Sequence, residues 1–183
     1  SEIEKNYSLF LIDLWGVIHN GIKIFPEIPE VLGNLQKKKK EIIFITNAPR
    51  RALVIENQLT EFGIDRELYS RVISSGEITW RYLFEKFRDK NVNILHIGPP
   101  RDNHLIEGLS FTKVSKPEEA EIIVNTGPWG DNDKLENYKN ILDQSLKNKL
   151  LMICSNPDKE VIRGDKFMIC AGKLAEYYEE KGG

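Results

Sequence analysis

Asp13 lies where an apolar run meets a turn, in the stretch FLIDLWGVIHNG (residues 10–21). A carboxylate at the end of an apolar strand, followed by a turn that glycine permits, is well placed to act as a nucleophile or as an acid/base group. Trp15, however, stands two positions on, where a second carboxylate would complete an acid/base pair. The stretch therefore indicates a working site, a modified one, or only the end of a core strand.

A hydroxyl and an amide end the next strong apolar run, as Thr46 and Asn47. If both runs are neighbouring strands of a parallel sheet, their ends lie side by side and bring Asp13 near Thr46. A carboxylate nucleophile facing small polar donors suits phosphoryl transfer. The alternative is that Asp13 caps a turn and that Thr46 and Asn47 cap a helix before Pro49.

Short apolar runs alternate with amphipathic stretches throughout the chain. The runs predict strands over 9–12, 42–46, 72–74, 92–97, 121–125 and 150–154. The stretches between them predict helices over 26–38, 52–62, 77–87 and 133–146. This alternation predicts an α/β protein with right-handed crossovers and mainly parallel sheets, whose ligands bind at the carboxyl ends of the strands.

The composition excludes several classes of protein. The 183 residues carry a net charge of −2, which argues against a dedicated nucleic-acid binder. No apolar run approaches the roughly 18 residues that span a bilayer, and no signal peptide is visible, so a cytoplasmic protein without a membrane partner is expected. The few residues that could ligate zinc lack suitable spacing; they are Cys154, Cys170, His19, His96 and His104.

Two stretches resemble motifs of the haloacid dehalogenase (HAD) superfamily. FLIDLWGVIHNG is similar to motif I and FITNAPRR (residues 44–51) to motif II. The later stretches ISSGEIT, VNTGPWGD, LLMICSNPDKEVIRG and CAGKLAEYYEEKGG resemble segments of subclass IIA in their usual order. The resemblance implies a Rossmann-like HAD core, present here only in part over 1–80, with an inserted C2-type α/β cap over 81–183.

The resemblance also implies roles for individual residues. Asp13 would be the nucleophile that forms an aspartyl-phosphate and would bind Mg²⁺ together with the backbone carbonyl of Trp15. Thr46 and Asn47 would complete the catalytic set and hold the phosphoryl group of a small phosphorylated metabolite. Substrate or phosphate binding would fall to Trp15, Gly16, Arg50, Asn156 and Asp158. Alternatively, Arg50 is a solvated residue at a helix start, and Asn156 to Asp158 form a plain Asx turn.

The sequence departs from the family pattern in two places. Trp15 replaces the acid/base aspartate, and an indole has no titratable proton at neutral pH. The chain also ends before a Gly-Lys-Pro motif and a later acidic motif, and Lys173 is expected to be a surface helix residue rather than the missing lysine. We therefore expect a fragment with weak Mg²⁺ binding, low or no activity, and an open apolar sheet edge that drives self-association into homo-oligomers.

Three functions are weighed at this point. The first is a HAD-like phosphatase. The second is a non-catalytic phosphometabolite-binding or interaction protein built on a degraded site. The third, a receiver-like signalling domain, shares the aspartate at the strand end but does not explain the second group of strands.

Overall fold

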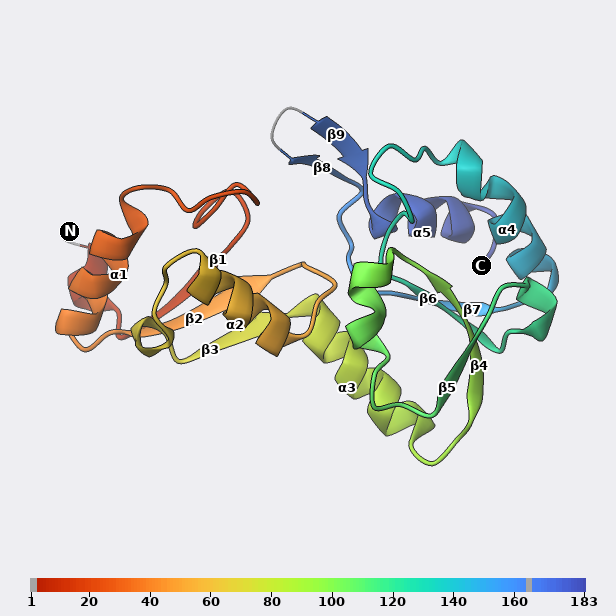
Figure 1. Cartoon of the computed structure of the whole chain (residues 1–183), viewed down its shortest axis with the longest axis horizontal. Coiled ribbons are helices and arrows are strands. Elements are labelled where there is room, and N and C mark those ends of the chain that lie inside the picture. The colour runs from red at the N-terminus through yellow and green to blue at the C-terminus, as the bar shows by residue number, and fades with distance from the viewer. Residues whose placement is uncertain (1–2, 164–165) are drawn as a thin grey trace. The chain divides into compact units, whose positions relative to one another are not determined.

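The computed structural model describes residues 3–163 and 166–183. Contacts within the chain divide it into two units, which are described separately (Figure 1). The first unit takes Ser1–Thr46 and Arg51–Ser74, and the second takes Asn47–Arg50 and Ser75–Gly183. The division expected from the sequence, after residue 80, falls inside helix α3 (Ser75–Phe87), which belongs as a whole to the second unit.

The first unit is built on a three-stranded parallel sheet. Its strands are β1 (Leu9–Asp13), β2 (Glu41–Thr46) and β3 (Arg71–Ser74), in the order β1-β2-β3. Helix α1 (Ile28–Lys37) connects β1 to β2 and helix α2 (Ala52–Glu61) connects β2 to β3. The short 3₁₀ helices η1 (Ile3–Asn6) and η2 (Arg66–Leu68) complete the unit.

The two faces of this sheet differ in burial. One face carries Ile42, Phe44 and Val72, which are buried. Buried side chains of the two helices pack in the same core; they are Leu32, Ile55 and Leu59. The opposite face carries four large apolar side chains that stay exposed among the described residues: Leu9, Leu11, Ile45 and Ile73. The first unit therefore has a one-sided core.

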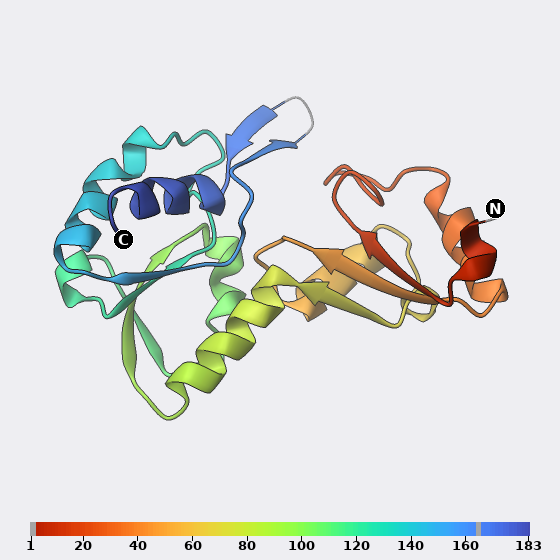
Figure 2. The same ribbon diagram turned by 180° about the vertical axis from the view of Figure 1, so that it is seen from behind.

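The second unit contains a four-stranded parallel sheet with the order β5-β4-β6-β7. Its strands are β4 (Val92–Ile97), β5 (Phe111–Val114), β6 (Ile122–Asn125) and β7 (Leu151–Cys154). Helices α4 (Glu136–Lys147) and α5 (Ala171–Glu180) cover one face, and α3 with the 3₁₀ helix η3 (Pro100–Leu105) covers the other, as Figures 1 and 2 show. A further 3₁₀ helix, η4 (Pro117–Glu119), precedes β6.

Each face of the second sheet has its own buried cluster. The cluster under α4 and α5 includes Leu95, Ile123 and Leu142, and the cluster under α3 and η3 includes Ile94 and Leu83. Adjacent residues of β4 thus point to opposite faces, and both faces are apolar. This continuous burial is typical of a parallel strand covered by helices on both sides.

The α/β class with parallel sheets is confirmed. The six strands expected from the sequence are present, and their observed bounds differ by at most one residue at either end. Three short strands were missed: β5, and the antiparallel pair β8 (Glu160–Arg163) and β9 (Lys166–Ile169). They were missed because each is only four residues long and mixes charged with apolar side chains.

Candidate functional site

A compact loop holds Asp13 at the end of β1. The buried side chains of Leu14 and Ile18 anchor the loop, and the Leu14 carbonyl accepts a hydrogen bond from the Ile18 N–H at 2.9 Å. Gly16 has a φ of 78°, which glycine adopts without strain, and its N–H donates to the His19 carbonyl at 2.8 Å. The side chain of Asp13 is exposed, and its Oδ1 accepts the Leu14 N–H at 2.8 Å. This bond orients the carboxylate and leaves Oδ2 for another partner.

The strand register relates Asp13 to Thr46. Asp13 lies beside Ile45, so Thr46 comes one residue later, at the same carboxyl edge of the sheet. Because side chains alternate along a strand, Asp13 starts from the exposed face with Ile45, and Thr46 starts from the buried face. The two side chains can therefore meet only beyond the edge of the sheet, and their convergence on one phosphoryl group stays a prediction.

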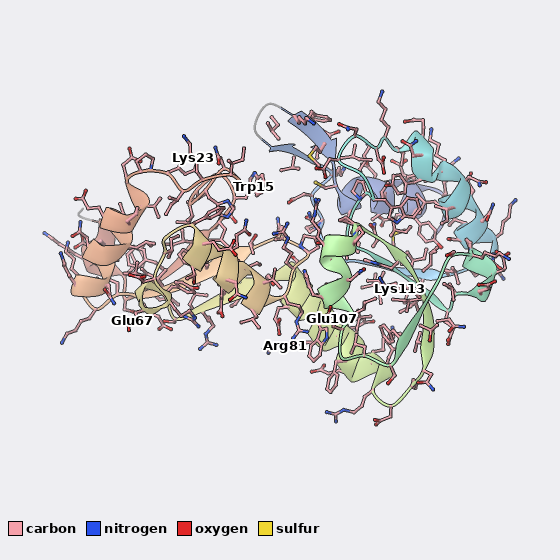
Figure 3. All side chains as sticks on the ribbon, in the orientation of Figure 1. Trp15, Lys23, Glu67, Arg81, Glu107 and Lys113 are labelled. Carbon is pink, nitrogen blue, oxygen red and sulfur yellow. The ribbon has the colours of Figure 1, made fainter. Side chains whose placement is uncertain are left out.

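Trp15, in the loop after β1, is labelled in Figure 3 and is 38% exposed. Its ring packs edge-on against His19, with 5.7 Å between the centroids. The indole also lies over Gly21, whose φ is 83° and where an added Cβ would overlap the indole ring. His19 is buried, and its Nδ1 accepts the Gly21 N–H at 3.0 Å. That nitrogen is therefore unprotonated and helps to hold the turn.

Asn47 falls in the second unit, together with the residues up to Arg50. Its Nδ2 donates to Asp158 Oδ1 at 3.2 Å, a bond across 111 positions of sequence. The segment is fixed by the Gly76 N–H, which donates to the Ala48 carbonyl at 3.1 Å. Gly76 must lack a side chain here because a Cβ would overlap the backbone of Arg50. The structure thus brings together two residues that the sequence selected, Asn47 and Asp158.

Asn156 and Asp158 form the Asx turn that was one of the alternatives for this stretch. Asn156 Oδ1 accepts the Asp158 N–H at 2.9 Å. The Asp158 carbonyl then accepts the N–H of Gly172 at 2.9 Å, in the first turn of α5. The turn leaves the Asp158 carboxylate directed toward Asn47, so the Asx turn and a role in binding are compatible.

Arg50 and Lys173 have different surroundings. The charge of Arg50 lowers the pKa of Asp102, although burial of that carboxyl, the larger effect, raises it. Lys173 lies in the first turn of α5, where its Nζ donates to Glu176 Oε2 at 2.7 Å. This hydrogen bond raises the pKa of Lys173. Its place on α5 agrees with its interpretation as a helix residue.

The described residues offer few ligands for a metal ion. They contain no group of three or more His, Cys, Asp or Glu side chains suited to holding one. At the end of β1, Asp13 Oδ2 and the Trp15 carbonyl are the candidate oxygen ligands. Mg²⁺ prefers six oxygen ligands and is often held by one or two carboxylates, with waters and phosphate oxygens as the rest. The donor type fits Mg²⁺, but these two oxygens alone make a weak site.

One polar cluster escaped the sequence analysis. Asp102 is 3% exposed and lies in η3, while Thr126, also buried, follows β6. The Thr126 hydroxyl lies 3.2 Å from His96 Nε2. The only signal was the position of these residues at or just after strand ends, because nothing in the spacing of Asp102 marks it as buried.

Comparison with known proteins identifies the family. A model described as haloacid dehalogenase-like hydrolase matches residues 10–112. The chain belongs to the haloacid dehalogenase-like hydrolases. A hydrolase of this family from Brucella suis is 33% identical and superposes with a TM-score of 0.89 over 100% of this chain. This chain spans 66% of the length of that relative.

More distant members of the same fold include two named phosphatases. A 4-nitrophenylphosphatase from Thermotoga maritima is 22% identical, with a TM-score of 0.71 over 97% of this chain and 66% of its own. A p-nitrophenyl phosphatase from Archaeoglobus fulgidus is 21% identical, with a TM-score of 0.72 over 96% of this chain and 65% of its own. No curated protein matches the sequence. Within the described residues, no helix has both the length and the apolar character to cross a membrane.

Proposed function

We propose that this chain carries the nucleophile half of a HAD-like phosphatase that acts on a small phosphorylated metabolite. The observation that carries the proposal is the position of Asp13. It ends β1 at the carboxyl edge of a parallel sheet, one strand away from Thr46, in a member of a hydrolase family. The names of two solved relatives, both nitrophenyl phosphatases, support phosphate esters as the substrate class.

The proposed reaction has two displacements at phosphorus. Asp13 Oδ2 attacks, the bond between phosphorus and the ester oxygen breaks, and the leaving oxygen departs with the electron pair. The Leu14 N–H holds Oδ1 and orients the attack, and the Thr46 hydroxyl donates to the phosphoryl group. Water then attacks the phosphorus of the aspartyl-phosphate, which releases inorganic phosphate and restores the Asp13 carboxylate.

The leaving oxygen needs a proton unless it is a weak base. A positioned acid contributes typically about 10²–10⁴-fold, and the Trp15 indole N–H is not acidic at neutral pH. Alkyl phosphates should therefore react far more slowly than nitrophenyl phosphate. Mg²⁺ would be held by Asp13 and the Trp15 carbonyl, and when bound it would neutralise charge on the phosphoryl group.

We further propose that the second unit is the cap of this enzyme. Asn47 follows the catalytic strand directly, yet it is held by Asp158 of the turn before α5. This link gives the second unit a direct bond to the residue beside Thr46. A cap in this role would exclude water and select the substrate by its size.

The proposal is tested with nitrophenyl phosphate and glycerol 3-phosphate as paired substrates. Hydrolysis of the nitrophenyl ester should be detectable with added Mg²⁺ and should be lost in Asp13→Asn, which keeps the size of the side chain. Trp15→Asp should raise the rate mainly for glycerol 3-phosphate. Glu67→Gln, a matched loss of charge at a distant position in η2, serves as the control. Equal hydrolysis by wild type and Asp13→Asn would refute the nucleophile.

Trp15 also favours a second function, a non-catalytic protein that binds phosphometabolites. Without an acid beside the nucleophile, binding can persist while turnover is lost. Calorimetry separates the two functions, because tight binding of a phosphate ester that remains unhydrolysed over hours supports only the second.

A further inference from the structure

The second sheet contains a point where the chain turns in two directions. From β4 the chain passes through η3 to β5 on one side, and from β6 it passes through α4 to β7 on the other. The two connections also cover opposite faces of the sheet. In parallel α/β sheets such a switch point opens a crevice at the carboxyl ends of the two strands, and ligands bind there.

The carboxyl ends of β4 and β6 carry a buried polar cluster. Gly98 follows β4, and a Cβ there would overlap the Thr126 hydroxyl and lie 2.7 Å from His96 Nε2. Thr126 in turn interacts with the carboxyl group of Asp102, which lowers its pKa. The absence of a side chain at Gly98 therefore permits the strand end, the hydroxyl and the carboxyl to gather at one point.

Asp102 has an unused acceptor in this cluster. Its Oδ1 is buried and has no hydrogen-bond partner among the described residues. Buried polar atoms nearly always have partners, because leaving one unpaired costs about 1–3 kcal/mol. An acceptor kept unpaired at the ligand-binding position of a sheet indicates that a donor comes from outside the chain.

The surrounding charges restrict the ligand. Arg50 and Arg101 act on Asp102 from two segments, and both lower its pKa against the effect of burial. A metal ion would need further carboxylates, which no cluster of the described residues supplies. A bare anion would accept hydrogen bonds from the arginines but could not donate to Oδ1. A group with adjacent hydroxyls can do both, because each hydroxyl donates and accepts.

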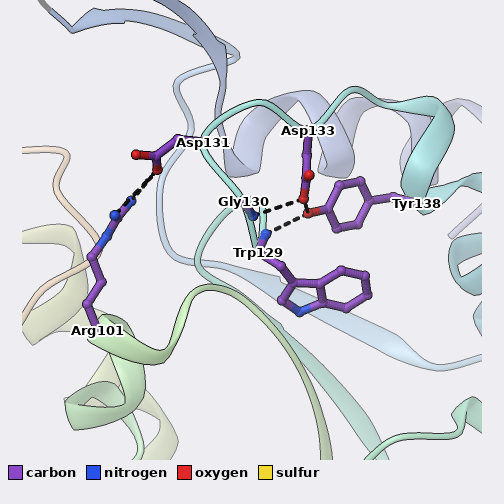
Figure 4. A network of polar contacts seen from close by, with 6 residues as sticks. All are labelled: Arg101, Trp129, Gly130, Asp131, Asp133 and Tyr138. Atoms are coloured by element: carbon purple, nitrogen blue, oxygen red, sulfur yellow. Dashed lines mark hydrogen bonds and ion pairs between the residues drawn. The ribbon is translucent and has the colours of Figure 1, made fainter.

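The rim of the crevice is suited to opening. Arg101 reaches across to Asp131 at 3.4 Å, an exposed and weak ion pair between η3 and the loop after β6 (Figure 4). The far side of that loop is held more firmly, since Asp133 Oδ2 accepts both the Tyr138 hydroxyl and the Gly130 N–H. A six-residue 3₁₀ helix has poor hydrogen-bond geometry, so η3 is the side that can move to uncover Oδ1.

We propose that the crevice between the ends of β4 and β6 binds a small polyhydroxylated molecule of the sugar or polyol type. Asp102 Oδ1 accepts a hydrogen bond from one ligand hydroxyl, Thr126 contacts its neighbour, and the arginines favour ligand oxygen atoms. The site lies within the second unit and does not depend on any reaction at Asp13. Its failure would therefore leave the phosphatase proposal untouched.

The test is a binding titration on the full chain, followed by nuclear magnetic resonance of the backbone amides. The probes are ribose, glycerol and myo-inositol, with inorganic phosphate as the probe that lacks adjacent hydroxyls on carbon. At least one polyol should shift the amides of residues 98–105 and 126–131, and phosphate should not. Shifts by phosphate alone, or by no probe, would overturn the proposal.

Two variants sharpen this test. Asp102→Asn replaces the charged acceptor with a weaker one, and polyol binding should weaken about tenfold or more, as expected for loss of a charge-assisted bond. Glu107→Gln makes the same charge change on an exposed side chain shortly after η3 and should bind as wild type does. The amide spectrum of each variant shows whether it is folded. A folded Asp102→Asn that binds the polyol unchanged would show that Asp102 is structural only.

Discussion

The two sheets of this protein are parallel and similar in width but differ in how they are covered. The second sheet has buried clusters on both faces, under α4 and α5 on one side and under α3 and η3 on the other. The first sheet buries one face, while the other exposes Leu9, Leu11, Ile45 and Ile73. A parallel sheet is normally covered on both faces. The first unit therefore carries an apolar surface that the second unit does not have.

This difference separates two uses of a strand end. In the first unit the strand-end carboxylate, Asp13, is exposed at the edge of the half-covered sheet. In the second unit the polar groups at the strand ends, Asp102 and Thr126, are buried beneath short segments. The same topology thus presents one acid to solvent and encloses another.

Removing a buried side chain from the covered sheet should have the largest effect. Leu142→Ala in α4 deletes atoms from a fully buried side chain and should cost about 2–5 kcal/mol of unfolding free energy. Leu11→Ala, the same change on the open face at 59% exposure, should stay within about 0.5 kcal/mol. Urea denaturation followed by circular dichroism checks both. Similar losses at the two positions would mean that the open face is covered.

Acid should weaken the second unit through His96. Burial, the largest cause, lowers its pKa from 6.5 to about 4, with the charges of Lys113 and His104 adding to the effect. Between these values the unfolded state binds more protons, so stability falls as the pH drops below about 6.5 and the loss levels off near 4. The loss is at most about 3 kcal/mol. His96→Gln should show a smaller loss over this range, and equal slopes for variant and wild type would contradict the burial of His96.

A pair of glycines tests the packing of Trp15 in the first unit. Gly21 and Gly63 both have φ near 84°, at 83° and 85°. Alanine at either position should cost about 1 kcal/mol of strain. Gly21→Ala should cost about 1–3 kcal/mol more, because its Cβ would overlap the Trp15 ring, whereas no atom lies near Gly63. Thermal unfolding compares the two, and equal losses would place the indole elsewhere.

The open face should affect assembly more than stability. We expect the wild-type chain to self-associate through the exposed strands of the first unit, and Leu11→Lys should reduce this, because a charge on a sheet opposes pairing. Leu53→Lys, on the surface of α2 at 66% exposure, is the matched control and should not change assembly. Light scattering measures both. A wild-type chain that stays a monomer at high concentration rules out this association.

Much of the fold followed from the sequence, because period and length mark parallel strands and amphipathic helices well. The run that became β4 was predicted with its observed bounds, since it is continuously apolar and flanked by polar residues. The hairpin β8–β9 was missed because strands as short as Glu160–Arg163 have no clear period.

The site was predictable in part. Asp13 and Thr46 were found because chemistry at the ends of parallel strands leaves a local signal. The bond between Asn47 and Asp158 connects residues far apart in sequence, and single-sequence spacing holds no record of such a contact. The burial of Asp102 was invisible for the same reason, since it depends on the path of η3 over the sheet.

The Asn47–Arg50 segment has a consequence for the order in which the protein is made. Strands β1 and β2 can pair as soon as both have left the ribosome, because each is complete by Thr46. The next residue, Asn47, must wait for Asp158, which is synthesised 111 positions later, and the intervening Gly76 must arrive to bind the Ala48 carbonyl. Since chains fold progressively from the N-terminus during synthesis, the residues that adjoin Thr46 are among the last to reach their final conformation. A nascent chain halted before the turn at Asp158 would thus carry Asp13 and Thr46 on a folded sheet, with the residue beside them still unanchored.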